Sequence, residues 1–442
     1  MSRAETVRRN ARWALAQLVD ASVAERLVIA LAALVASLLL GGAIVLAAGH
    51  NPVTVVLFLI YGAIGTPGQV AFTLRKATML VLAGVAVAIA FRANVFNIGV
   101  QGQLVVGGFA TAMTILWLAP YLPAGGLAGL VLVACGLVAG VGGGAAYAAL
   151  PGAMKAYADA NEVVTTIMLN FIATGVLFVL VDGPLKDPEA AAPKTLNFPD
   201  YAGFPSLLGV SDSFSLVGLA IALAAVVVVY VVMTTTRFGY DLRTTGYQAA
   251  ASAYSGVDPE RTVVSTMVAS GMVAGLAGAV YVVMVVGYFQ DPGVFPTFGF
   301  DGIAVSLLAA NNPLGAVPAG LLFGALSSGR QFVDVNLDVP KELIDGIVGL
   351  IVLFVATPEL FRHLGRRAGL GGGEGPAGEE GEAVADGGEP IAGSDGDESD
   401  GEPGPWTADG DESDGETGPR TTDGDEPPDP DGPTRSDGGE PA

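Results

Sequence analysis

Long apolar runs recur along the first 370 positions, and short polar segments separate them. The run at 27–49 has 23 residues, enough for an α-helix to cross the hydrocarbon core of a bilayer. Other runs of spanning character cover 77–91, 104–119, 126–150, 161–181, 216–233, 262–286 and 344–356. Further apolar segments, at 53–63, 303–310 and 314–326, are short. The pattern predicts an all-α, polytopic membrane protein with about 8–10 transmembrane helices.

A polar segment at 91–103, which contains two glycines, separates the apolar runs 77–91 and 104–119. Lipid cannot hydrogen-bond a loosened backbone, so such a break must face protein, a water-filled cavity or an interface. Transporters place solute sites at interrupted membrane helices. An ordinary loop rich in asparagine and glycine is the alternative interpretation.

A second break lies in the other half of the chain. The apolar run 303–310 covers only about 12 Å at helical rise, and Asn311-Asn312-Pro313 follows it. Two interrupted segments in different halves predict an internally repeated transporter with its site between the breaks. Glu162, Thr166 and Asn170 share one face of an apolar helix, and such a stripe favours a bundle interior or a solute pathway.

Neutral amides can hydrogen-bond hydroxyls or bases without requiring a charged solute. The residues predicted to line the substrate pathway are Asn94, Asn97, Gln101, Gln103, Thr166, Asn170, Asn311 and Asn312.

The polar segment 235–261 is the second informative stretch. Three arginines place it in the cytoplasm. Residues 248–254 are alanine-rich and predict a short helix ended by Gly256, after which Asp258 caps a new helix with Pro259 in its first turn. A short helix between two spans suits docking into a groove on a soluble partner, whereas an amphipathic piece resting on lipid is the alternative. The predicted docking residues are Gly246, Gln248, Ala249, Ala250, Ala253, Tyr254 and Gly256.

Positive charge predicts the orientation of the spans. Four arginines in the first 12 residues and three at 362–367 place segment 1–26 and the end of the last span in the cytoplasm. Starting a span at 77 leaves Arg75 and Lys76 in the connection before it, on the outer side and against the positive-inside trend.

Asn161 is predicted to cap the helix that it precedes, and the glycines at 136–144 predict close helix packing.

The formal net charge of −22 belongs almost wholly to the tail. Segment 371–442 holds 23 acidic residues against two arginines, whereas the membrane domain 27–370 and segment 1–26 are together nearly neutral. The tail is rich in glycine and proline and is predicted to be disordered. Excess carboxylate also favours a halophilic source with a salt-rich cytoplasm.

The sequence offers little for catalysis. Cys135 is the single cysteine, and the two histidines, His50 and His363, stand at opposite ends of the membrane domain. No Gly-x-x-x-x-Gly-Lys-Ser/Thr phosphate loop occurs, so ATP hydrolysis must come from another chain. The protein is therefore not expected to be an enzyme.

Four motifs, at 91–103, 161–170, 238–256 and 300–315, occur in the order found in a known family. Together they resemble the permease subunit of ABC importers in the branched-chain amino acid, ribose and nucleoside permease family, nearest to the simple sugar or nucleoside permeases. The resemblance covers 77–356. Many relatives carry glutamate where Gln101 stands, and the acidic tail has no counterpart in the family.

The resemblance implies a multi-pass subunit of a prokaryotic plasma membrane. It implies pairing with a second, identical or homologous permease, an ATPase subunit that binds ATP and Mg²⁺, and an external solute-binding lipoprotein. Residues 248–256 would be the coupling helix. No cofactor in this chain and no nucleic-acid partner are expected; membrane lipid surrounds the spans.

Two other functions stay open. A branched-chain amino acid permease would share the same architecture. A stand-alone carrier or channel needs no docking loop, and an ion-coupled one would bury acidic residues in its spans. Asp301 and Asp345 are expected near membrane edges, which favours the importer. A structural scaffold explains neither break.

Overall fold

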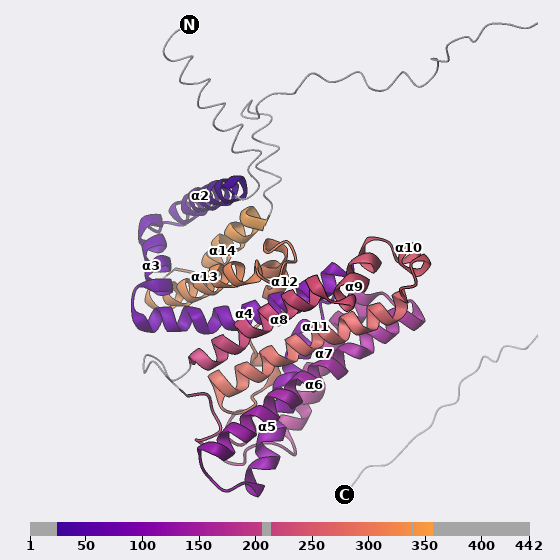
Figure 1. Ribbon diagram of the computed structural model, residues 1–442. Coiled ribbons are helices and arrows are strands. Elements are labelled where there is room, and N and C mark those ends of the chain that lie inside the picture. Colours follow the sequence, from indigo (N-terminus) through magenta and orange to yellow (C-terminus); the bar gives the residue numbers. More distant parts are fainter. Residues whose placement is uncertain (1–23, 206–213, 338, 357–442) are drawn as a thin grey trace, which may run out of the picture. The chain divides into compact units, whose positions relative to one another are not determined.

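The computed structural model describes residues 24–205, 214–337 and 339–356 (Figure 1). The predictions for segment 1–26 fall almost wholly outside these residues, and those for the tail 371–442 do so entirely. Within the described part the chain is helical, and its β-structure is limited to one isolated bridge between Lys194 and Gln290. The prediction of an all-α, polytopic membrane protein is confirmed.

The α-helices are α2 (Ala24–Ala47), α3 (Pro52–Ile64), α4 (Pro67–Arg92), α5 (Val100–Leu118), α6 (Gly126–Ala158), α7 (Glu162–Asp182), α8 (Leu216–Thr235), α9 (Arg237–Tyr247), α10 (Ala249–Tyr254), α11 (Pro259–Tyr281), α12 (Phe298–Leu308), α13 (Ala316–Asn336) and α14 (Lys341–Ala356). Short 3₁₀ turns occur at η1 (Ala119–Tyr121) and η3 (Pro292–Val294), and a π-helical turn, η2 (Val282–Val286), extends α11. By length and composition, 6 described helices can cross a membrane: α4, α5 with η1, α6, α7, α8, and α11 with η2.

Local capping explains where several helices begin. Asn161 precedes α7, and its Oδ1 accepts hydrogen bonds from Val163 N at 3.0 Å and Val164 N at 3.2 Å. Asp258 precedes α11, and its Oδ1 accepts from Arg261 N at 3.1 Å. Both predicted caps are confirmed. Each satisfies backbone N–H groups that a helix N-terminus leaves without partners.

Helix α4 begins ten residues before the predicted span at 77–91. Thr66 caps it through a hydrogen bond from Gln69 N at 3.2 Å, and Pro67 starts the first turn. The prediction that Arg75 and Lys76 lie in a connection was therefore wrong, because both are inside the helix. Lys76 is accommodated there since its Nζ donates to Ser327 O, Ser327 Oγ and Gln331 Oε1, each at 3.0 Å.

Helices α5, α6 and α11 meet through glycines. A Cβ placed on Gly275 of α11 would lie 2.2 Å from the carbonyl oxygen of Gly140 and 3.0 Å from Gly144 Cα on α6. A Cβ on Gly107 of α5 would lie 2.4 Å from Gly275 Cα. The predicted close packing is confirmed. Only residues without side chains let three membrane helices approach to backbone contact at one level.

The segment after α7 packs against the segment after η2. Thr195 N donates to Phe289 O at 2.9 Å, and Phe198 N donates to Gly287 O at 2.7 Å. Because α8 and α11 are joined at their other ends by α9 and α10, the two loop systems belong to opposite ends of the helices (Figure 1).

Candidate functional site

The first break is held by a network of buried amides. Helix α4 ends at Arg92, α5 begins at Val100, and Asn97 lies between them with 0% exposure. Asn97 Nδ2 donates to Gln103 Oε1, and Gln103 Nε2 donates to Asn97 Oδ1, both at 3.0 Å. The two amides therefore face each other directly.

The same amide of Asn97 reaches α11 and its own backbone. Its Nδ2 also donates to Ser270 Oγ at 2.8 Å, and its Oδ1 accepts from Gly99 N at 3.1 Å. Ser270 Oγ in turn donates to the carbonyl of Ala86 in α4 at 2.6 Å. Both donors and both acceptor sites of Asn97 are thus used within the protein. These hydrogen bonds offset the cost of burying the Asn97 amide, as a break at membrane depth requires.

Helix α7 closes the other side of the break. Asn170 Oδ1 accepts from Gly102 N at 2.8 Å, and Asn170 Nδ2 donates to Ile98 O at 3.0 Å. Thr166, one turn earlier, is fully buried and donates to Glu162 O at 2.6 Å. The polar stripe predicted on this helix therefore faces the first break.

Gln101 connects the first break to the start of α12. Its Oε1 accepts from Gly299 N at 2.8 Å, and its Nε2 donates to Pro296 O at 3.1 Å. A Cβ on Gly302, one turn further, would lie 2.8 Å from Ala83, near the middle of α4. Helix α12 thus begins halfway along α4, as expected for an interrupted element. Asp301 in its first turn therefore stands beside the middle of α4, contrary to the expectation that it lies near a membrane edge.

The second break lies beside the C-terminal end of α4. Ala310 and Asn311 have positive φ angles of 50° and 55°. Ser306 Oγ donates to Asn311 Oδ1 at 3.0 Å, and Asn312 Oδ1 accepts from Leu314 N at 3.0 Å. Arg92 Nε donates to Asn311 O at 3.0 Å and so joins the two breaks.

The predicted pathway residues thus form two groups. Asn97, Gln101, Gln103, Thr166 and Asn170 are buried around the first break, and their side-chain hydrogen bonds are made within the protein. Asn94 is exposed just beyond Arg92, with a φ of 56°, and belongs with Asn311 and Asn312 at the end of α4. Ser270 belongs to the first group but is not among the predicted residues. It lies 173 positions from Asn97 in the chain, so no local pattern points to it.

The predicted docking helix is present as α10, one residue shorter at its start than expected, and Gly256 follows it with a φ of 80°. Tyr254 at its end is 96% exposed, and Tyr247 at the end of α9 is 91% exposed. Tyr247 is missing from the predicted docking set, although an aromatic residue in a polar loop was an available signal. Two tyrosines exposed to this extent on one short loop are typical of a protein interface.

The segment 235–261, predicted to be a docking loop and called so below, touches the first break directly. A Cβ built on Gly246 of α9 would lie 2.3 Å from Arg92 O and 3.1 Å from Ala93 Cα. Leu242, one turn earlier, is fully buried and anchors α9 in the helical core. A movement of α9 would therefore push on Arg92, the residue that also hydrogen-bonds Asn311 O in the second break.

No group of three or more His, Cys, Asp or Glu side chains able to hold a metal ion occurs among the residues with described coordinates. The chemistry of the site is hydrogen bonding by neutral amides and backbone groups.

Comparisons with known proteins agree with this architecture. The family described as branched-chain amino acid transport system / permease component matches residues 69–356. A guanosine ABC transporter permease of Bacillus subtilis is 33% identical over 341 residues, which cover 76% of this chain and 95% of that protein. A nucleoside ABC transporter permease of Lactococcus lactis is 30% identical over 75% of this chain and 91% of its own length.

A glucose ABC transporter permease of Haloferax volcanii is 31% identical over 74% of this chain and 86% of that protein. No solved structure matches the chain. The family match extends from the first turn of α4 to the end of α14 and includes both breaks and the docking loop. This chain therefore belongs to the branched-chain amino acid transport system / permease component family.

Proposed function

We propose that this protein is the membrane-spanning permease subunit of an ATP-driven importer for a nucleoside or a simple sugar. The observation that carries the proposal is the backbone contact between Gly246 in the docking loop and Arg92 at the first break. Relatives named as guanosine, nucleoside and glucose permeases, each at least 30% identical, support the substrate class.

The contact supplies a route from ATP to the pathway. An ATPase subunit that holds ATP and Mg²⁺ docks on α10 and the adjacent tyrosines Tyr247 and Tyr254, on the cytoplasmic side. Closure of two such subunits displaces α9. Because Gly246 of α9 packs directly on the backbone of Arg92, with no space between them, Arg92 must move as well. Arg92 passes the displacement to the second break through its hydrogen bond to Asn311 O.

The amides around the first break then exchange partners. In the described conformation Asn97 and Gln103 satisfy each other, which keeps the path closed to solute. When α4 moves relative to α11, these amides become available to hydroxyl groups or to a base edge. A solute-binding lipoprotein delivers the solute from outside, and a second permease completes the path.

Copurification tests the proposal. The tagged protein is isolated gently from its native membranes, and mass spectrometry identifies what accompanies it. The expected partners are an ATPase subunit, a second permease and a solute-binding lipoprotein. Purification alone, with solute flux retained in ATP-free liposomes, would show instead a carrier or channel.

A further inference from the structure

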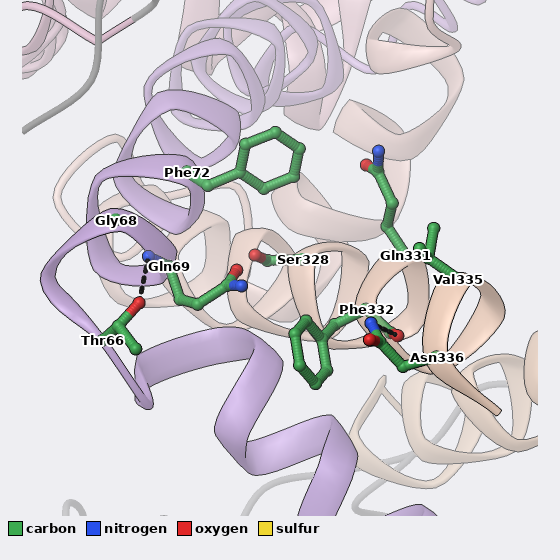
Figure 2. A pocket seen from close by; sticks show the side chains of 9 residues that line it. All are labelled: Thr66, Gly68, Gln69, Phe72, Ser328, Gln331, Phe332, Val335 and Asn336. Atoms are coloured by element: carbon green, nitrogen blue, oxygen red, sulfur yellow. Dashed lines mark hydrogen bonds between the residues drawn. The ribbon is translucent and has the colours of Figure 1, made fainter.

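A pocket of about 340 Å³ lies between the first turns of α4 and the last turns of α13, away from both breaks. Figure 2 shows Gln69 and Ser328 near its centre, with Phe72 and Phe332 on opposite sides of them. Gln331 and Asn336 also line it. The pocket therefore combines aromatic rings with side-chain amides, and its described lining contains no carboxylate.

The amides of the pocket keep unused hydrogen-bonding groups. Lys76 donates to Gln331 Oε1 at 3.0 Å, so the NH₂ group of Gln331 is oriented away from that contact and has no partner among the described residues. Asn336 Nδ2 donates to Phe332 O at 2.8 Å, which leaves its Oδ1 as an acceptor. The side-chain amide of Gln69 makes no hydrogen bond within the described part of the chain, and so offers both a donor and an acceptor.

Neighbouring side chains contact both aromatic rings of the pocket. Arg75 lies 4.2 Å and Lys76 lies 4.8 Å from the ring centroid of Phe72. Phe332 packs on two rings of α3, with centroid distances of 5.8 Å to Phe58 and 5.4 Å to Tyr61. Fixed rings and a lysine-oriented amide form a pocket whose geometry is set before a ligand arrives, which lowers the entropic cost of binding.

The pocket lies at the end of α4 opposite the docking loop. Twenty residues of helix separate Phe72 from Arg92, which corresponds to about 30 Å, the thickness of a bilayer core. Figure 1 shows α3 at one end of α4 and α9 toward the other. With the docking loop in the cytoplasm, as in the proposed function, the pocket opens on the side from which an importer receives its solute.

We propose that this pocket is an outer solute-binding site of the permease, and that it takes a nucleoside by its base. The proposal rests on the proposed function and adds a second position to the path. A base is flat and apolar on its faces and carries donors and acceptors on its edge, which suits Phe72 and Phe332 together with Gln69 and Gln331. Every base has a π-face that can stack on an aromatic ring, so the pocket accepts purines and pyrimidines alike.

Photolabelling of the permease–ATPase complex in lipid nanodiscs, without the solute-binding protein, tests this assignment. The probe is 8-azidoguanosine. The expected label lies on peptides containing residues 66–76 or 328–336, with protection by guanosine and none by glucose at equal concentration. Label confined to other peptides, or protection by glucose alone, overturns the proposal.

Two variants and a matched control sharpen the test. Phe72→Leu and Gln331→Leu are each expected to reduce labelling about tenfold at subsaturating probe, the usual size of a lost base contact. Phe178→Leu makes the same aromatic change on the exposed face of α7 and is expected to leave labelling unchanged. Equal labelling in all three variants contradicts the proposal. A second outcome also contradicts the proposal: Phe72→Leu lowers the amount of assembled complex recovered but leaves the labelling of each complex unchanged. The pocket would then be an assembly surface.

The failure of this inference is distinguishable from that of the proposed function. ATP-driven uptake of guanosine or glucose by the complete wild-type transporter is measured in parallel. Uptake with no label in the pocket contradicts only the outer site. Absence of ATP-driven uptake of either solute contradicts the importer itself and, with it, the nucleoside occupant.

Discussion

Gly246 lies against the carbonyl of Arg92 so closely that a Cβ on the glycine would be 2.3 Å from the oxygen. Gly246 belongs to the segment 235–261, for which we propose docking on a soluble partner, and Arg92 ends the helix that leads into the first break. Arg92 also hydrogen-bonds the carbonyl of Asn311 in the second break. Three segments far apart in the sequence therefore meet at the C-terminal end of α4.

Gly246→Ala is expected to uncouple transport. The added methyl group forces α9 away from α4, and overpacking of this kind costs about 1–3 kcal/mol. Solute imported per ATP hydrolysed should fall about tenfold in proteoliposomes, while the ATPase subunit still copurifies. Gly175→Ala on α7, where a Cβ meets nothing within 4 Å, is the control. Equal coupling in the two variants would contradict the proposed route.

Asn97→Leu is expected to reduce transport without preventing assembly. The change leaves the side-chain amide of Gln103 and the N–H of Gly99 without a buried partner, at about 1–3 kcal/mol for each unsatisfied group. It also removes the hydrogen bond that Ser270 Oγ accepts, while the bond from Ser270 Oγ to Ala86 O stays. Asn170→Leu removes the bonds to Gly102 N and Ile98 O, and the same loss is expected. Initial uptake rates and size-exclusion profiles check both effects. Unchanged uptake by both variants would show that these amides have no part in the pathway.

Asn97 and Ser270 are expected to be energetically coupled. Their side chains hydrogen-bond at 2.8 Å, and Ser270 then bonds Ala86 O. In a double-mutant cycle with Asn97→Leu and Ser270→Ala, the loss of unfolding free energy should be smaller than the sum of the single losses by about 0.5–3 kcal/mol. Thermal unfolding of the purified complex gives the four values. Strict additivity would mean that the network is not a unit.

Lys76→Met is expected to lower thermal stability. It removes the three hydrogen bonds that join α4 to Ser327 and Gln331 of α13. Lys186→Met is the control, because it makes the same change in side-chain volume. It removes a part-exposed ion pair to Asp182 and should lower the free energy of unfolding by less than about 1 kcal/mol. The difference between the two melting temperatures is the measurement. Equal melting temperatures would contradict a structural role for the intrahelical lysine.

Tyr254→Ala is expected to weaken recovery of the ATPase subunit at least several-fold, because exposed aromatic residues dominate interface energies. Tyr121→Ala provides the control, since Tyr121 is comparably exposed but follows α5, far from α10 in the chain. Quantitative mass spectrometry of the copurified subunit measures both. Equal recovery would place the ATPase contact elsewhere.

Local chemistry predicts part of this structure well. Asn161 and Asp258 cap their helices within three residues, and α10 follows from its alanines and the glycine after it, so neighbouring positions suffice. The sequence could not show that α4 starts at Pro67, because the cost of Lys76 inside the helix is offset by Ser327 and Gln331, about 250 positions away. Ser270 and the Gly246 contact were missed for the same reason. Asp301 was misplaced because α12 begins level with the middle of α4, which only the packing of Gly302 on Ala83 reveals.

The position of Asp301 makes a direct test against an ion-coupled carrier necessary. Proteoliposomes that hold this permease with its ATPase, second permease and solute-binding protein are given labelled guanosine or glucose, with and without internal ATP and Mg²⁺. The account predicts accumulation of one of these solutes that requires ATP and is lost when the ATPase subunit is omitted. Accumulation driven by a proton or sodium gradient in vesicles containing this chain alone would contradict it.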